Sequence, residues 1–83
     1  MKVGIVGGGQ LARMMAIAGY PLGIEFLVLD PNDRASAAQV APLLPGNFSD
    51  VARLQALADS VHVMTFDLEN VPASALRSLA GAT

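Results

Sequence analysis

The segment VGIVGGGQLA, residues 3–12, decides the fold of this chain of 83 residues. A short apolar run, Val3–Val6, leads into three consecutive glycines, which is typical of a buried parallel strand that opens into a tight turn. Apolar residues at helical spacing follow over residues 10–18, and a second apolar run covers residues 24–29. Strand, glycine turn, helix and strand within thirty residues predict a βαβ unit with a right-handed crossover.

Further elements are expected around this unit. Gly19 and Pro21 are expected to end the first helix. The later elements that the pattern predicts are a short helix over residues 34–40, an edge strand at Leu43-Leu44 between two prolines, a helix that Ser49 or Asp50 caps, a strand over residues 61–66 and a last helix from Pro72. This order predicts one α/β domain over residues 1–83, a three-layer Rossmann-like fold with a parallel sheet of about four strands in the order 3-2-1-4.

The composition excludes several classes of protein and site. The chain has no cysteine, one histidine and only five Lys and Arg residues, with a formal net charge of −2. These counts argue against a disulfide scaffold, a thiolate or histidine metal cluster, and nucleic acid or an anionic membrane as a partner. The sequence shows neither a signal-peptide pattern nor an apolar run long enough to span a bilayer, so we expect a cytoplasmic protein.

Charged residues are scarce. They make up 14% of the chain, whereas apolar residues make up 53%. A typical soluble domain has about 25% charged residues, so this chain has few with which to cover a free-standing surface. We therefore expect a fragment of a larger protein that exposes an apolar patch when isolated. Such a patch favours association, most simply as a symmetric homodimer.

The glycine turn predicts an anion-binding site. Gly7, Gly9 and Ala12 match the spacing G-x-G-x-x-G/A of dinucleotide-binding folds, in the required context of strand, turn and helix. Backbone N–H groups of residues 8–11 are expected to point outward at the start of the helix, where they favour an anion. Asp30 ends the second strand, which is the position of the ribose-binding carboxylate in a Rossmann domain. NAD(P) binding is therefore one hypothesis, and a turn without a ligand is another.

Two later carboxylates weigh against a dinucleotide. Asp67 and Glu69 follow the strand over residues 61–66 and, two residues apart in extended chain, project to the same side. They are expected at the carboxyl ends of the first and last strands, where the crevice of an open α/β sheet lies. Carboxylates there repel a pyrophosphate and favour a ligand that is rich in hydrogen-bond donors, such as a sugar or an amine. The alternative is a pair of solvated acids before a helix N-terminus.

Other polar or soft side chains have structural explanations. His62 lies in an apolar strand with nothing nearby that completes a catalytic dyad, so we expect a hydrogen-bonded or edge histidine. Met14 and Met15 are expected in the core. Arg13 could reach a phosphate at the glycine turn, but a solvated arginine on a helix is the simpler interpretation. No serine has the sequence context of a hydrolase nucleophile.

The order of these motifs resembles a known family. The segments VGIVGGGQLARM, residues 3–14, and AGYPLG, residues 18–23, are similar to the N-terminus of 5-(carboxyamino)imidazole ribonucleotide synthetases, which are ATP-grasp enzymes. Leu29-Asp30-Pro31 and TFDLENVP, residues 65–72, continue the match in order, so that the resemblance covers essentially the whole chain. The glycine turn alone is a weak signal, but its combination with the later Glu-Asn-Val-Pro is specific.

The resemblance implies a pre-ATP-grasp domain whose glycine turn binds the substrate, 5-aminoimidazole ribonucleotide, instead of a nicotinamide. The whole ligase would use ATP, Mg²⁺ and bicarbonate to carboxylate the amine of this substrate in purine biosynthesis. Carried over by position, Gln10, Leu11 and Glu69 contact the substrate, and the expected site is completed by Gly8, Gly9 and Asn70. The family's ATP and Mg²⁺ residues follow the matched segment. The resemblance thus implies no catalytic or metal-binding residue here and no activity of the fragment alone.

Two positions depart from the family pattern. Ala12 replaces a usual glycine, which the helix packing tolerates, and Asp67 replaces a usual glutamate, whose side chain is one methylene longer. The second departure bears on the role of Asp67 more than on that of Glu69. Three hypotheses for function follow: the substrate-binding domain of this ligase, an NAD(P)-binding domain of an oxidoreductase, and a flavodoxin-like module without a small-molecule site.

Overall fold

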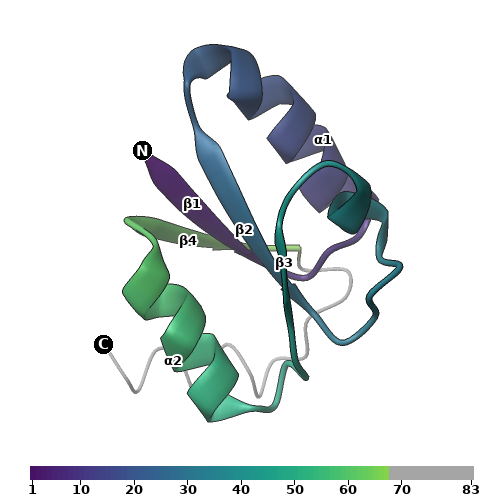
Figure 1. Ribbon diagram of the computed structural model, residues 1–83, viewed down its shortest axis with the longest axis vertical. Helices are drawn as coiled ribbons and strands as arrows, with labels where there is room; N and C mark the ends of the chain where they lie inside the picture. The colour runs from purple at the N-terminus through teal and green to yellow at the C-terminus, as the bar shows by residue number, and fades with distance from the viewer. Residues whose placement is uncertain (68–83) are drawn as a thin grey trace.

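The computed structural model describes residues 1–67, which form a parallel sheet with helices on both faces (Figure 1). The elements in chain order are β1 (Lys2–Val6), α1 (Gln10–Gly19), the 3-10 helix η1 (Tyr20–Leu22), β2 (Glu25–Asp30), the 3-10 helix η2 (Ser36–Gln39), β3 (Leu43–Pro45), α2 (Val51–Ser60) and β4 (Val63–Phe66). Four parallel strands have the order β3-β2-β1-β4, which confirms the predicted topology. The helix expected from Pro72 lies outside the described residues.

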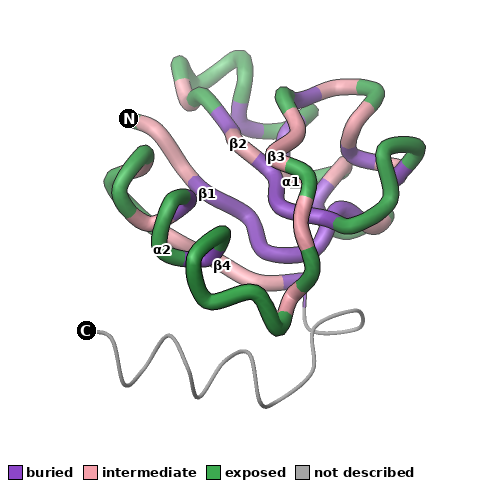
Figure 2. Tube along the Cα trace, turned by 60° about the horizontal axis from the view of Figure 1, so that its bottom comes forward, coloured by how far each residue is buried: buried purple, intermediate pink, exposed green. Residues whose placement is uncertain are grey.

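Two hydrophobic clusters lie on opposite faces of the sheet. Ile5 and Val28 pack on the α1 side, whereas their chain neighbours Val6 and Leu29 pack on the α2 side. This alternation follows from the two-residue repeat of a strand, and it explains why β1 and β2 are apolar throughout. Figure 2 shows the central strands buried between helices whose outer turns are exposed. The three-layer fold expected from the sequence is therefore present.

The strand register brings one set of loops to the same edge of the sheet. Val6, the last residue of β1, pairs with Leu29 of β2 and with Phe66 of β4. The residues that follow these strands leave the sheet at its carboxyl edge, where ligands of open α/β folds bind. The glycine turn after β1, Asp30 at the end of β2 and Asp67 after β4 all lie at that edge.

The first helix ends later than the sequence predicted. Gly19 has a right-handed helical φ of −83°, and the chain continues through η1. Pro21 lies in the first turn of η1, where an N–H group has no acceptor within the helix, so proline is tolerated there. Gly23, with a φ of 80°, ends the turn and donates its N–H to the carbonyl of Tyr20 at 3.0 Å. Gly19 is required for packing instead, because a Cβ there would lie 2.3 Å from the ring of Phe26.

The structure corrects two smaller expectations, for residues 34–40 and for Met14, and confirms the capping of α2. The short helix over residues 34–40 is a 3-10 helix of four residues, and the N–H of Ala37 donates to the carbonyl of Gly8. Of the two capping candidates for α2, Asp50 is the cap, since its Oδ1 accepts from the N–H of Arg53 at 3.2 Å. Met14 is exposed and lies outside the core, whereas Met15 packs against it as expected.

Candidate functional site

The glycine turn joins β1 to α1 and is the centre of the candidate site. Gly7 has a φ of 99°, a conformation that side chains disfavour, and its N–H donates to the carbonyl of Leu29 at 2.8 Å. This bond continues the ladder between β1 and β2 by one residue past the end of β1. The turn therefore leaves the sheet in a fixed direction.

Gly8 is held from two sides. Its N–H donates to Oδ2 of Asp30 at 2.8 Å, and its carbonyl accepts from the N–H of Ala37 at 2.9 Å. A Cβ at this position would lie 3.1 Å from both Ala35 Cβ and Val28 Cγ1, so a side chain here would have to displace these neighbours. Of the amides expected to face a ligand, that of Gly8 is engaged inside the protein.

The N-terminus of α1 lies directly after this turn. Gly9 is the N-cap residue and provides no side-chain cap, and no acidic residue stands in the first turn. The first N–H groups of an α-helix have no acceptor within the helix and carry a partial positive charge. The N–H groups of Gln10 and Leu11 belong to this set. The structure thus places both residues at a helix N-terminus, as the sequence predicted.

Two side chains of α1 are bonded to η2. The Oγ of Ser36 donates to Oε1 of Gln10 at 3.1 Å, and the guanidinium of Arg13 donates to Oε1 of Gln39 at 2.9 Å. Arg13 thus makes an exposed side-chain contact, and its reach to a phosphate at the glycine turn stays a prediction. Together with the bond between Ala37 and Gly8, these contacts hold η2 against the start of α1.

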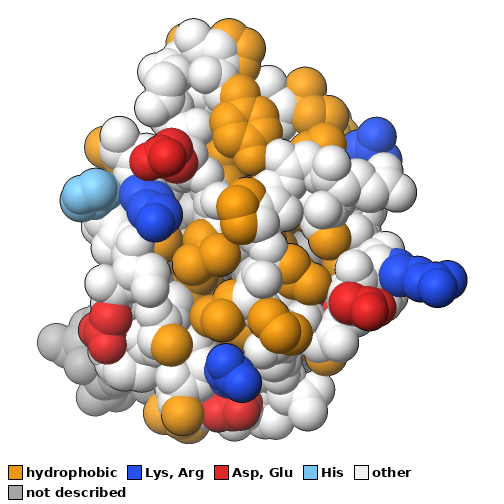
Figure 3. Space-filling view, in the orientation of Figure 1, with side chains coloured by type: hydrophobic (Ala, Val, Ile, Leu, Met, Phe, Trp, Pro, Cys, Tyr) orange, Lys and Arg blue, Asp and Glu red, His pale blue; other side chains and the backbone are white. Residues whose placement is uncertain are grey.

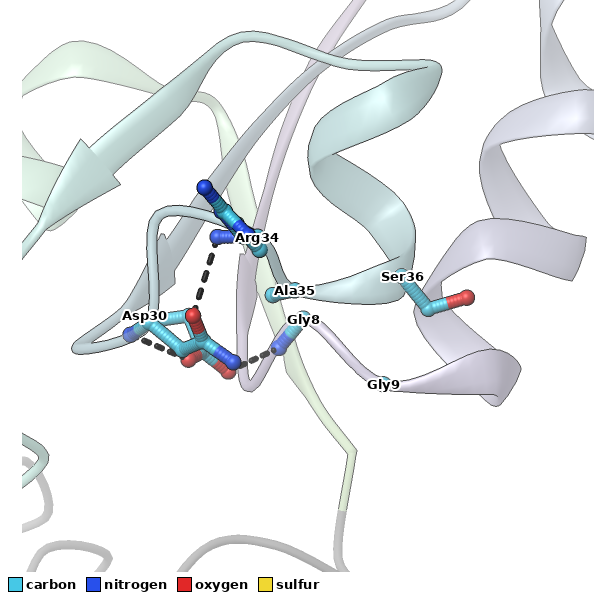
Figure 4. A pocket seen from close by; sticks show the side chains of 7 residues that line it. Gly8, Gly9, Asp30, Arg34, Ala35 and Ser36 are labelled. Carbon is cyan, nitrogen blue, oxygen red and sulfur yellow. Dashed lines mark hydrogen bonds between the residues drawn. The ribbon is translucent and has the colours of Figure 1, made fainter.

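A pocket of about 290 Å³ lies between the glycine turn and the segment that follows β2 (Figure 4). Its lining consists of Gly8, Gly9, Asp30, Asn32, Arg34, Ala35 and Ser36. These residues offer backbone amides, a hydroxyl and a guanidinium as donors, and carboxylate and amide oxygens as acceptors, which suits a polar ligand. The pocket lies on the β1–β2 side, whereas the sequence placed the crevice between the first and last strands.

Sequence reasoning missed Asn32, Arg34 and Ser36 as lining residues. The run Asp30-Pro31-Asn32-Asp33 was a turn signal after a strand, and loops at the carboxyl edge of a parallel sheet are where binding residues gather. In the structure, Oδ1 of Asp30 accepts from the N–H of Asn32 at 2.8 Å, and Oδ1 of Asn32 accepts from the N–H of Arg34 at 3.0 Å. These two local bonds shape the loop that forms one wall of the pocket.

Asp67 is the last residue of the described part. It is fully buried, and its N–H donates to the carbonyl of Val6 at 2.9 Å, so it lies beside the start of the glycine turn. The interpretation of Asp67 as a solvated loop acid is therefore wrong. Glu69 and Asn70, the other predicted site residues after β4, lie outside the described residues.

His62 has the structural role that the sequence favoured. It is exposed at the beginning of the last strand, and its Nδ1 accepts from the N–H of Lys2 at 2.9 Å. Its own N–H donates to the carbonyl of Lys2 at 2.8 Å. This pair of bonds joins the chain before β4 to the start of β1, at the edge of the sheet opposite the glycine turn.

Residues 1–67 contain no group of three His, Cys, Asp or Glu side chains placed to hold a metal ion. Within the same range, every helix is too short or too polar to cross a membrane.

Comparison with known proteins identifies similar chains. The family model of the ribonucleotide synthetase pre-ATP-grasp domain matches residues 1–83. N5-carboxyaminoimidazole ribonucleotide synthase from Pseudomonas aeruginosa is 46% identical over 79 residues, which are 95% of this chain and 22% of that protein. The chain spans about one fifth of the length of such relatives, including those with solved structures, so it corresponds to one segment of longer enzymes.

Solved structures of the same enzyme share this fold. N5-carboxyaminoimidazole ribonucleotide synthetase from Thermus thermophilus superposes with a TM-score of 0.86 at 49% sequence identity, covering 96% of this chain and 22% of that one. N5-carboxyaminoimidazole synthetase from Staphylococcus aureus, solved in complex with ADP, superposes with a TM-score of 0.86 at 33% identity over the same shares of the two chains. The similarity therefore covers the fold and the sequence together.

Proposed function

The chain belongs to the family of ribonucleotide synthetase pre-ATP-grasp domains, and we propose that it is the substrate-binding domain of a cytoplasmic ATP-dependent ligase. This ligase carboxylates 5-aminoimidazole ribonucleotide with bicarbonate in purine biosynthesis. The names of the relatives support the assignment, since they are synthases of N5-carboxyaminoimidazole ribonucleotide. They favour it over the NAD(P)-binding alternative.

The observation that carries the proposal is the uncapped start of α1 at the carboxyl edge of the sheet. Gly9 brings no side chain to the N-cap position, where Ser, Thr, Asp or Asn would satisfy an N–H group of the first turn. The N–H groups of Gln10 and Leu11 are thereby left for a ligand. Leu11 is 46% exposed, so a ligand can approach it. A helix N-terminus in this state suits the polar groups of a ribonucleotide.

The proposed site combines these donors with acceptors after β4. Gly9, Gln10 and Leu11 donate N–H groups, and Gly8 contributes its shape, since its own N–H is bound to Asp30. Glu69 and Asn70 complete the site from the segment after β4, with Glu69 accepting from substrate hydroxyl or amine groups. Asp67 is buried beside the start of the glycine turn.

The residues for ATP and Mg²⁺ are proposed to lie outside this chain. The chain covers only about one fifth of the length of its relatives, and its sequence has no phosphate-binding lysine loop. The chain should therefore supply substrate binding without the chemical step. A chimera in which it replaces the matching segment of the Pseudomonas aeruginosa relative should retain ATP-dependent carboxylation. A chimera that folds and hydrolyses ATP but lacks carboxylation contradicts the assignment.

Titration calorimetry of the chain with 5-aminoimidazole ribonucleotide, and separately with NAD⁺, tests the proposed ligand. Glu69→Gln should weaken ribonucleotide binding about 10- to 150-fold, because a charge-assisted hydrogen bond contributes about 1.5–3 kcal/mol. The matched control is Glu25→Gln. It removes the same charge from an exposed residue at the start of β2, whereas the glycine turn lies at the carboxyl edge of the sheet. Binding of NAD⁺ in place of the ribonucleotide, or equal losses in the two variants, overturns the proposal.

We also propose that the protein forms a homodimer through the outer face of α1. Met14 and Ile17 lie three residues apart on this face and are 57% and 52% exposed. Arg13 is the single charged side chain of α1 and is bonded to Gln39 of η2. Figure 3, in the orientation of Figure 1, shows hydrophobic side chains gathered in the middle of one face of the molecule, with charged side chains around them.

Sedimentation equilibrium tests this interface. The wild-type chain should sediment as a dimer, and Ile17→Glu should shift it to a monomer by placing a charge in the apolar stripe. Ala52→Glu, an exposed position in the first turn of α2 where an acid is favourable, should leave the dimer intact. A monomeric wild-type chain, or a dimer unaffected by Ile17→Glu, contradicts the proposed contact.

A further inference from the structure

We propose that Asp30 is a positioning residue: its carboxylate fixes the Gly7–Gly8 peptide, so that the N–H groups at the start of α1 face the ribonucleotide. The inference rests on the proposed function. It assigns to Asp30 a role different from that of the ribose-binding carboxylate in a dinucleotide fold. Asp30 acts through the glycine turn, which its carboxylate joins to the loop after β2.

The carboxylate of Asp30 joins two loops. One oxygen, Oδ2, accepts from the N–H of Gly8, and the other, Oδ1, accepts from the N–H of Asn32, both at 2.8 Å. Gly8 and Asp30 are 22 residues apart in sequence, so the bond ties the first crossover of the sheet to the loop after β2. The side chain is only 8% exposed, which keeps water from competing for these donors. Figure 4 shows both bonds converging on the carboxylate.

The glycine turn is fixed from the opposite side as well. The carbonyl of Gly8 accepts from the N–H of Ala37 in η2, at 2.9 Å. Both polar groups of Gly8 are thus occupied, one by Asp30 and one by η2, and Ala35 and Val28 pack closely against the same residue. The turn cannot rotate without breaking one of these bonds. The direction of the next N–H groups, at Gly9 and Gln10, follows from that constraint.

The chemistry of the site requires a carboxylate. Two N–H donors approach two different oxygens, and only an ionised carboxylate offers both as acceptors without a donor of its own. Asparagine has the same shape but replaces one oxygen by an NH₂ group, which would face an N–H donor. The negative charge also strengthens both bonds. Asp30→Asn therefore removes one of the two bonds while it preserves the size of the side chain.

Amide hydrogen exchange and ribonucleotide affinity, measured on the 83-residue chain, test the proposal with matched variants. Asp30→Asn should speed exchange at Gly8 or at Asn32 about 10- to 150-fold, the factor that corresponds to one charge-assisted hydrogen bond. Asp30→Asn should also weaken the binding of 5-aminoimidazole ribonucleotide. Asp33→Asn is the control, because Asp33 is exposed in the same loop and loses the same charge. Neither quantity should change in this control.

The exchange of Ile5, in the core of β1, separates a local effect from unfolding. Equal acceleration at Ile5 and Gly8, or an unchanged rate at both Gly8 and Asn32, overturns the positioning role. Unchanged ribonucleotide affinity in Asp30→Asn with faster exchange at Gly8 also overturns it, because the turn then moves without consequence for the ligand. Failure of the wild-type chain to bind the ribonucleotide contradicts the proposed function instead. The exchange rates still decide in that case whether Asp30 fixes the turn.

Discussion

The helices α1 and α2 are both ten residues long and cover opposite faces of the same sheet, but they bury different side chains. α1 buries only its small residues, which are Ala12, Ala16 and Gly19. Of its larger apolar side chains, Leu11, Met14 and Ile17 are exposed, and Met15 packs against the core while only partly buried. α2 buries Leu54 and Leu57 and exposes polar residues, which is the usual pattern of a helix on a protein surface.

The two helices also begin differently. The side chain of Asp50 caps α2 by accepting from an N–H group of its first turn, whereas Gly9 leaves the first turn of α1 without a side-chain cap. In α2, large buried residues and a cap both stabilise the fold. In α1, small buried residues allow a close approach to the sheet, and the uncapped end is where we propose that the ligand binds. Stability and the proposed ligand contact are therefore divided between the two faces.

The largest effect should come from the buried leucines of α2. Leu57→Ala should lower the free energy of unfolding by about 2–5 kcal/mol, since it leaves a cavity in a fully buried position. Ile17→Ala, at an exposed position of α1, should change it by less than about 0.5 kcal/mol. Urea unfolding at low protein concentration measures both. Comparable losses would show that the outer face of α1 belongs to the core of the single chain.

An intermediate effect should come from the small buried residues of α1. Ala16→Leu inserts three carbon atoms where the helix lies against the sheet, so it should cost about 1–3 kcal/mol of stability by overpacking. Ala56→Leu, at an exposed position of α2, is the control and should be nearly neutral. The two variants are compared by their urea midpoints. A neutral Ala16→Leu would mean that the close approach of α1 is not needed for the fold.

The smallest effect should come from the cap of α2. Asp50→Ala should cost about 1 kcal/mol, because the N–H of Arg53 loses its acceptor. Ser49→Ala, one residue earlier, should have no measurable effect on the thermal midpoint. The opposite order of the two variants would assign the cap to Ser49 and contradict the geometry.

Most of the fold could be predicted from the sequence because its strands are buried on both faces. Runs such as Val3–Val6 have no alternative to a central parallel strand, and the strand order follows from the crossovers. The end of α1 was not predictable in the same way. A glycine before a proline is a common signal for the end of a helix, but Gly19 is present because Phe26 lies against it, and that contact depends on the tertiary packing.

The site was predicted in part. The position of Gln10 and Leu11 at a helix start follows from local sequence, and the structure contains it. The bond from Gly8 to Asp30 joins residues far apart in sequence, so only the register of β1 with β2 reveals it. The same register brings Arg34 and Ser36 to the pocket. Met14 was assigned to the core because it is apolar, although its position in the helical repeat places it on the outer face.

The edge strand β3 has a consequence for how this sheet meets other molecules. β3 has only three residues and ends at Pro45, and the carbonyl of Pro42, just before it, accepts from Val28 inside the sheet. Neither proline has an N–H group to offer to a neighbouring strand. A strand from another molecule would therefore find too few donors to pair along this edge. The two prolines protect the sheet from growing into a polymer on the β3 side.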